Sequence, residues 1–320
     1  EDNAEFGLGM RMAANVQTEL ARRRLQEVSS QLDPEFVEDL LHAPQLTEHD
    51  LQSQQHRVKE LQAKLADMEQ TPAVRDLMSV ADHLLRRSVW IIGGDGWAYD
   101  IGSGGVDHVL ASGRDVNVLV LDTEVYSNTG GQASKSTPLG AVAKFASAGK
   151  PTAKKDMALQ AIAYGSVYVA RVALGADPQQ TLRAFREAEA YPGPSLIIAY
   201  SHCIAHGYDL RNGLDQQYKA VHCGHWPLMR YNPVLADEGR NPFLLDSPKP
   251  DETWREYTKL ELRYRMLQKA HPEEAERMLD LGQRQVERRY AEYAEMASRT
   301  AEDFAVDARM SEFAASSNRA

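Results

Sequence analysis

The middle of the chain contains short runs of apolar residues, rich in β-branched types, at 88–93, 116–121, 167–172 and 195–200. Each run is short and continuously apolar, as strands are when both faces of their sheet are covered. Stretches with helical character separate most of the runs, and one of these begins at Asp177-Pro178. This alternation predicts an α/β fold built on a mostly parallel sheet. In such sheets, ligands bind at the carboxyl ends of the strands.

Helical patterns precede this core. Residues 10–30 are rich in Ala, Arg, Glu and Leu, which favour helices. A single apolar stripe at helical spacing follows, and it comprises Leu51, Val58, Leu61, Leu65 and Met68. Thr71-Pro72 then provides an N-cap and a first-turn proline for another helix. We expect the stripe to be a packing face and not a site.

The last third of the sequence opens with an irregular stretch from about 208, which contains Trp226-Pro227 and Asn241-Pro242. Two charged helices are expected after it, at about 251–270 and 272–297. The predicted division of the chain is therefore a helical segment at 1–87, an α/β core at 88–207, an irregular and helical region at 208–310, and a tail at 311–320.

Charge and composition exclude several classes of protein. The chain has 36 basic and 46 acidic residues, a net charge of −10, which argues against general nucleic-acid binding. It contains no apolar run near 20 residues and opens with no signal-peptide pattern, so neither a membrane span nor secretion is predicted. Its two cysteines, Cys203 and Cys223, are too few for a disulfide framework and are typical of a cytoplasmic protein.

Two of the predicted strands are followed by loops that offer oxygen ligands and small residues. Gly94-Asp95-Gly96-Trp97 follows the run at 88–93, and a loop beginning Asp122-Thr123 follows the run at 116–121. Both loops leave the same edge of the predicted sheet. A carboxylate between two glycines, together with a hydroxyl and exposed backbone, suits Mg²⁺ holding a diphosphate, because Mg²⁺ takes few carboxylates and shares its other positions with phosphate oxygens.

Two alternatives apply to the glycine-rich loop. A lone Gly-Asp-Gly is more often an ordinary turn than a site. A dinucleotide-binding fingerprint fails, because Gly102 and Gly104 would need a third glycine where the chain has Asp107.

Longer motifs make the interpretation specific. Gly94-Asp95-Gly96, followed after residues 97–122 by a metal-binding side chain, resembles the thiamine diphosphate motif, although most such enzymes have Asn where this chain has Thr123. That difference and the segment 123–150 resemble the pyruvate:ferredoxin (flavodoxin) oxidoreductase family. Segments at 94–113, 200–210 and 226–233 resemble it too. The resemblance covers nearly the whole chain, and it assigns the helical segment 1–87 to the thiamine diphosphate domain.

The resemblance implies roles for both loops. Asp95 and the Thr123 hydroxyl would bind Mg²⁺ by side chain, and Val125 would bind it by its carbonyl. The residues that would line the diphosphate or the thiazole end of the cofactor are Gly94, Gly96 and Trp97. The loop that would wrap the diphosphate comprises Thr123, Glu124, Val125, Tyr126, Ser127 and Asn128. Asn128 would face the reacting centre as the catalytic residue of this chain.

Cys203 acquires a second interpretation from the resemblance. It matches the last cysteine ligand of the family's [4Fe–4S] cluster, which needs four thiolates, and the other three would lie before Glu1. Cys223 matches no ligand position. Zinc bound by Cys203 with His202 and His206 is an alternative, but the spacing is cramped. Because the chain begins at Glu1 and not at Met, it is expected to be part of a longer polypeptide.

The family reaction implied is the oxidative decarboxylation of pyruvate with coenzyme A to acetyl-CoA and CO₂, with electrons passing through iron–sulfur clusters to ferredoxin or flavodoxin. This chain would supply the diphosphate and Mg²⁺ half of the thiamine diphosphate site. The expected partners are the missing N-terminal domains of the same polypeptide and a second copy in a homodimer. Two alternatives remain open: another thiamine diphosphate-dependent 2-oxoacid enzyme, or a truncated fragment without catalytic activity.

Overall fold

The structure is a computed structural model that describes residues 3–304; the predicted tail at 311–320 lies outside the described residues. The chain forms two compact units. One consists of residues 6–89, and the other combines the first residues of the chain with everything from Trp90 onward. Along the described residues, no helix is both long and apolar enough to cross a membrane.

The smaller unit is entirely helical. Its helices are α1 (Ala4–Val28, whose first residues belong to the larger unit), α2 (Pro34–His42), α3 (Glu48–Asp67) and α4 (Pro72–Val80), with short 3₁₀ turns at Ser29–Gln31 and Ala81–Leu84. The predicted stripe on α3 is a packing face, because Val58, Leu61 and Leu65 are buried in the core of this unit. Thr71 caps α4 as predicted, since its hydroxyl accepts a hydrogen bond from the amide of Val74.

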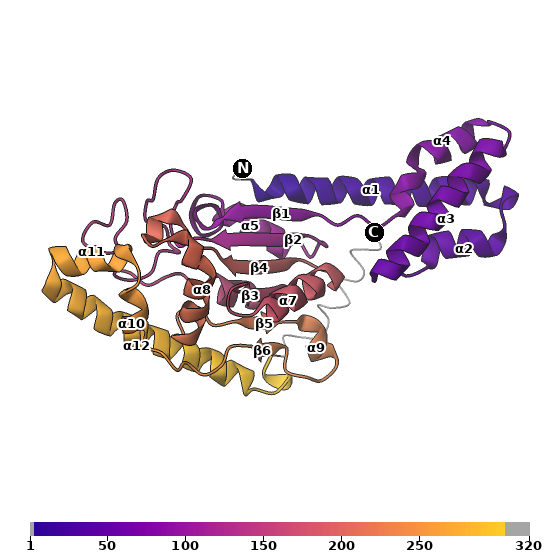
Figure 1. The fold of residues 1–320 in the computed structure, drawn as a ribbon. Helices are drawn as coiled ribbons and strands as arrows, with labels where there is room; N and C mark the ends of the chain where they lie inside the picture. The colour runs from indigo at the N-terminus through magenta and orange to yellow at the C-terminus, as the bar shows by residue number, and fades with distance from the viewer. Residues whose placement is uncertain (1–2, 305–320) are drawn as a thin grey trace. The chain divides into compact units, whose positions relative to one another are not determined.

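The larger unit is built on a six-stranded sheet in the order β1-β2-β4-β3-β5-β6. Figure 1 shows these strands side by side. The predicted runs correspond to β1 (Trp90–Gly94), β2 (Asn117–Asp122), β3 (Tyr168–Val172) and β4 (Ser195–Tyr200), which are parallel to one another. The prediction of a mostly parallel α/β sheet is therefore confirmed.

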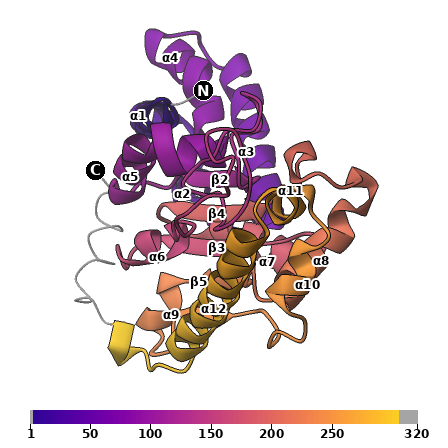
Figure 2. The same cartoon turned by 90° about the vertical axis from the view of Figure 1, so that its left-hand side faces the viewer.

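Helices cover both faces of this sheet. In Figure 2, α5 (Ser103–Ala111) and α6 (Met157–Ile162) lie on one side and α7 (Pro178–Ala190) lies on the other. Every residue of β3 is buried, which explains why its sequence is apolar without alternation. Asp177 caps α7 as the sequence predicts, with its carboxylate accepting from the amide of Gln180.

The region after 208 is more regular than predicted. It contains a 3₁₀ turn at Leu210–Asn212, helices α8 (Gly213–His222) and α9 (Pro233–Asp237), and strands β5 (Met229–Tyr231) and β6 (Phe243–Leu245), which extend the sheet in antiparallel fashion. The helix expected at 251–270 is two helices, α10 (Trp254–Thr258) and α11 (Leu262–Ala270). They separate near Glu261, whose carboxylate turns inward to Tyr257 and Arg263 and does not cap α11. Helix α12 (Pro272–Ala297) and a 3₁₀ turn at Glu302–Phe304 follow.

Glycines make room for the indole of Trp97 after β1. Trp97 opens a π-helical turn (Trp97–Ile101) and is 6% exposed. A Cβ atom at Gly93 would lie 2.3 Å from the indole, and one at Gly102 would lie 2.1 Å from it. These two positions therefore accept no larger residue unless Trp97 moves.

We expect Gly102→Ala to destabilise the protein by about 1–3 kcal/mol, because the added methyl overpacks the indole. The matched control is Gly104→Ala, two residues further along, where a Cβ atom has nothing within 4 Å. Alanine favours helices, so this control should be neutral or stabilising by up to roughly 1 kcal/mol. Chemical denaturation measures both variants. Equal free energies of unfolding for the two would contradict this packing.

Candidate functional site

The loops after β1 and β2 meet at the carboxyl edge of the sheet. Gly94 pairs with Leu121 in the ladder between the two strands, so both loops begin at the same level. Thr123 Oγ1 lies 2.8 Å from Asp95 Oδ1, to which it donates, and 2.9 Å from the carbonyl oxygen of Val125. Of the three oxygen atoms predicted to bind one cation, Thr123 Oγ1 thus contacts both of the others, one in each loop.

Asp95 is held rigidly and lies out of contact with water. It is 1% exposed, and its second oxygen accepts from the Ser134 hydroxyl at 2.8 Å. Burial and the nearby Asp122 carboxylate raise the pKa of Asp95 to about 7, although Lys154 and the hydroxyl hydrogen bonds oppose this rise. The site therefore disfavours the ionised carboxylate, and a cation at Oδ1 would compensate for this.

The glycines of the first loop have different surroundings. A Cβ atom at Gly96 would lie 2.3 Å from the ring of Tyr126, so the two loops pack directly on each other at this point. A Cβ atom at Gly94 would meet nothing within 4 Å, so the backbone there borders open space. Ser127 and Asn128 lie exposed in the turn that follows Tyr126.

The Glu124 side chain points away from this open space. It is fully buried, and its carboxylate contacts Lys154, His225 and Arg263. Any contact between Glu124 and a ligand at the loop would therefore come from its backbone.

A third loop at the same edge follows β4 and carries Cys203. His206, in the 3₁₀ turn Ile204–His206, places Nε2 2.7 Å from the carbonyl oxygen of Thr123. Cys203 is 9% exposed, and its sulfur accepts from the amide of Ala205 at 3.4 Å. Within residues 3–304, no group of three or more His, Cys, Asp or Glu side chains is arranged to hold a metal, and the zinc alternative finds no support there.

Several residues around the site were not predicted. They lie in or next to the long irregular segment between β2 and α6, and they are Asp122, Ser134, Ser136 and Lys154. Lys154 donates to Asp122 at 2.8 Å and to Ser136 at 2.6 Å, entirely below the surface. Serines and lysines in a glycine-containing segment usually indicate a solvated loop, so the sequence offered no signal for the burial of Ser134, Ser136 and Lys154. Asp122 directly ends an apolar run, and this position was the one indication that a buried charge lies here.

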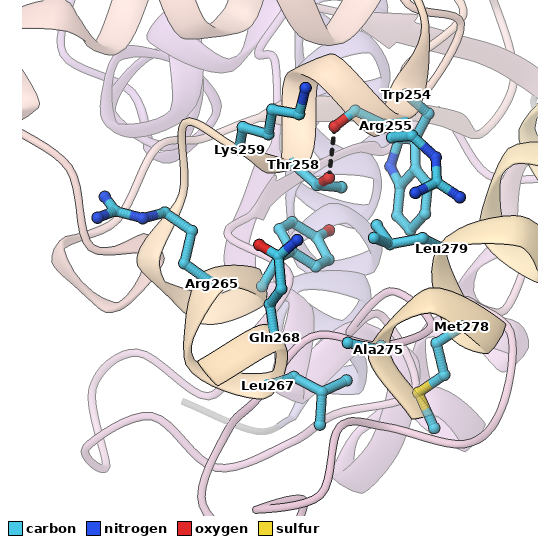
Figure 3. A pocket seen from close by; sticks show the side chains of 12 residues that line it. Trp254, Arg255, Thr258, Lys259, Arg265, Leu267, Gln268, Ala275, Met278 and Leu279 are labelled. Carbon is cyan, nitrogen blue, oxygen red and sulfur yellow. Dashed lines mark hydrogen bonds between the residues drawn. The ribbon is translucent and has the colours of Figure 1, made fainter. Parts of the chain in front are cut away.

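A separate pocket lies among the C-terminal helices. Figure 3 shows its lining, with Trp254 and Thr258 from α10, Leu267 from α11, and Ala275 and Met278 from α12. Its cavity volume is about 30 Å³, enough for water but too small for an organic cofactor. None of its lining residues was predicted to belong to the site.

The resemblance implies that the two loops hold a Mg²⁺-bound diphosphate. One carboxylate oxygen, one hydroxyl oxygen and one carbonyl oxygen are hard ligands, as Mg²⁺ requires. They leave further coordination positions for phosphate oxygens, and the open backbone at Gly94 adjoins them. The residues fit a Mg²⁺-bound diphosphate.

Comparison with known proteins agrees with this chemistry. Residues 77–199 match the family model of the thiamine pyrophosphate enzyme, C-terminal TPP binding domain, and this range includes both loops. The chain is 55% identical over 302 residues to a pyruvate-flavodoxin oxidoreductase of Trichormus variabilis, covering 93% of this chain and 25% of the relative. It is 48% identical over 304 residues to the pyruvate:ferredoxin oxidoreductase of Moorella thermoacetica, covering 93% and 26%.

Over residues 77–199 the chain thus matches the C-terminal thiamine pyrophosphate-binding domain family, and over 93% of its length it is similar to pyruvate-flavodoxin oxidoreductases. It spans about a quarter of the length of the curated relatives it matches. A solved 2-oxoglutarate:ferredoxin oxidoreductase from Magnetococcus marinus, with 2-oxoglutarate, coenzyme A and succinyl-CoA bound, is 25% identical. The likeness covers 37% of this chain and 40% of that one, with a TM-score of 0.34.

Lys150 holds the long loop between β2 and α6 through buried hydrogen bonds. It is 8% exposed, and its ammonium donates to two loop carbonyls, the nearer at 2.6 Å. Burial lowers the pKa of Lys150 to about 8. Lys154 and Lys135 add to this lowering, and Asp100 and Glu124 oppose it.

We expect Lys150 to give stability a particular pH dependence. Between its folded pKa of about 8 and its ordinary value of 10.5, the unfolded chain holds a proton that the folded protein has released. The free energy of unfolding therefore rises with pH in this window, by no more than about 1.4 kcal/mol per unit. Lys150→Met should remove this contribution, and the exposed Lys144→Met is the control. Denaturation curves recorded from pH 7.5 to 10.5 give the free energy of unfolding at each pH. If this free energy rises equally with pH in wild type and in Lys150→Met, the expectation is contradicted.

Proposed function

We propose that this chain forms the diphosphate- and Mg²⁺-binding half of the thiamine diphosphate site of a pyruvate oxidoreductase. The observation that supports this most directly is that Thr123 Oγ1 contacts both Asp95 Oδ1 and the carbonyl oxygen of Val125. Asp95 and Thr123 would bind Mg²⁺ by side chain and Val125 by backbone. The identity of about 50% to pyruvate-flavodoxin oxidoreductases, together with the thiamine pyrophosphate family match, supports the reaction class.

The residues of the two loops would hold and orient the cofactor. Gly94, Gly96 and Trp97 would face its diphosphate or thiazole end, where glycine allows close approach of the backbone. Residues 123–128 would wrap the diphosphate, and Asn128, exposed in its turn, would face the reacting centre. When bound, thiamine diphosphate supplies the electron sink for decarboxylation of a 2-oxo acid. Mg²⁺ held by Asp95, Thr123 and Val125 would offset the charge of the diphosphate, which would otherwise be costly to bury.

The overall reaction that we propose is oxidative decarboxylation of pyruvate with coenzyme A, giving acetyl-CoA and CO₂. Electrons would leave through iron–sulfur clusters to ferredoxin or flavodoxin, in a cytoplasmic homodimer. A [4Fe–4S] cluster does not fit the residues of this chain alone, because four thiolates are needed and the sequence contains two cysteines. Cys203 is proposed as one ligand, completed by three thiolates from other domains of the same polypeptide.

The metal assignment predicts that Asp95→Asn lowers the affinity for thiamine diphosphate at a fixed Mg²⁺ concentration by at least about 100-fold. Changes to residues that only support metal ligands already cost about 10–100-fold, so loss of a direct ligand should cost at least as much. Titration calorimetry on the protein, expressed with its natural flanking sequence, measures the affinity. The control is Asp107→Asn, which changes an exposed carboxylate that accepts a hydrogen bond from the Tyr164 hydroxyl at 2.7 Å. If both variants bind like wild type, the site does not hold the cofactor.

A further inference from the structure

Glu124 occupies an unusual place in the metal-binding loop. It lies between Thr123, whose hydroxyl donates to Asp95, and Val125, whose carbonyl oxygen contacts the same hydroxyl. Its φ is +59°, in the left-handed region that disfavours residues other than glycine, and its side chain is fully buried. A residue keeps such a conformation only when its surroundings determine it strongly.

Both the main chain and the side chain of Glu124 are fixed by buried partners. Its amide donates to Asp122 Oδ1 at 3.0 Å, and its carbonyl accepts from the Thr137 hydroxyl at 2.7 Å. One carboxylate oxygen lies 3.1 Å from Lys154 Nζ and 3.0 Å from His225 Nε2. These contacts leave little freedom for the loop to rotate about this position.

The other carboxylate oxygen of Glu124 accepts from the Arg263 guanidinium at 2.8 Å. Arg263 is buried at the start of α11, and its Nε donates to Glu261. Its carbonyl also accepts from the amide of Val142, further along the same loop, at 2.8 Å. Arg263 thus joins two parts of the loop, and a planar guanidinium can bridge two carboxylates in fixed geometry.

The helices around Arg263 pack on the loop as well. Leu267 of α11 and Met278 of α12 form an apolar cluster with Ala275 and with Val142 of the loop. A Cβ atom at Gly149 would lie 2.8 Å from Leu267 and 3.2 Å from Met278, so this contact is tight. Figure 3 shows Leu267, Ala275 and Met278 next to one another.

We propose that Arg263 is a positioning residue that, through Glu124, sets the places of Thr123 Oγ1 and the Val125 carbonyl for the cation. The proposal rests on the function proposed above. It assigns a role in the cofactor site to α11, which lies beyond the matched range 77–199. The buried ion pair between Arg263 and Glu124 fixes the loop backbone. It would affect the cation only through the positions of Thr123 and Val125.

The test compares two buried arginines, each paired with two carboxylates. Arg263→Met removes the contact to Glu124, whereas Arg230→Met removes contacts to Glu187 and Asp246 in another part of the sheet. Both should lower the thermal stability. Only Arg263→Met should raise the Mg²⁺ concentration for half-maximal thiamine diphosphate binding, by about 10-fold or more, while the KM for pyruvate stays within about twofold of wild type. Calorimetry gives the first quantity, and steady-state kinetics at saturating Mg²⁺ gives the second.

Glu124→Gln serves as the second variant if Arg263→Met does not fold. It keeps the shape of the side chain and weakens its pairing with the cations, so the Mg²⁺ requirement should again rise. Unchanged Mg²⁺ affinity in Arg263→Met, or in Glu124→Gln where the first variant is insoluble, overturns the proposal. The Asp95→Asn variant distinguishes failure of the proposed cofactor site from failure of the positioning role of Arg263. Wild-type affinity in Asp95→Asn refutes the cofactor site itself, whereas a loss there with no loss in the Arg263 and Glu124 variants refutes only the positioning role.

Discussion

The parallel pairing of β1, β2 and β4 in one register determines where the functional residues of this chain meet. Gly94 lies opposite Leu121, and Asp122 lies opposite Tyr200, so three loops start at one level of the sheet edge. This geometry brings Asp95 into contact with Thr123. It also places the His206 ring within hydrogen-bonding distance of the Thr123 carbonyl. Because helices cover both faces of the central strands, a slip in register would disrupt closely packed side chains, and this cost maintains the site geometry.

The sheet alone does not order the long segment between β2 and α6. That segment contains neither helix nor strand, and buried polar contacts take the place of a regular hydrogen-bond ladder. Lys154 pairs with Asp122 and Glu124, and Lys150 donates to backbone carbonyls. Desolvation offsets much of the attraction in such pairs, so they add little net stability. Losing one partner is nevertheless costly, and this cost confines the loop to one conformation.

What the sequence predicts well here is local. The strand runs, the caps at Thr71 and Asp177 and the two oxygen-rich loops each depend on neighbouring residues, and all were found from short patterns. The three-residue strands β5 and β6 are too short to show a period. The pairing of Glu124 with Arg263 spans 139 positions, and nothing local to either residue indicates it. The helix boundary near Glu261 was missed for the same reason, because the inward turn of that carboxylate depends on distant partners.

The left-handed backbone at Glu124 shows why a charged residue is useful at a position where glycine would be easier to accommodate. Glycine would relieve a strain of about 1–2 kcal/mol, but it would also let the loop adopt many other conformations. Glutamate accepts the strain and attaches the loop to Lys154, His225 and Arg263. A loop ordered in advance does not have to be ordered by its ligand, so less of the binding free energy is lost on association. The strain at Glu124 is thus the cost of ordering in advance the loop that carries the proposed cation site.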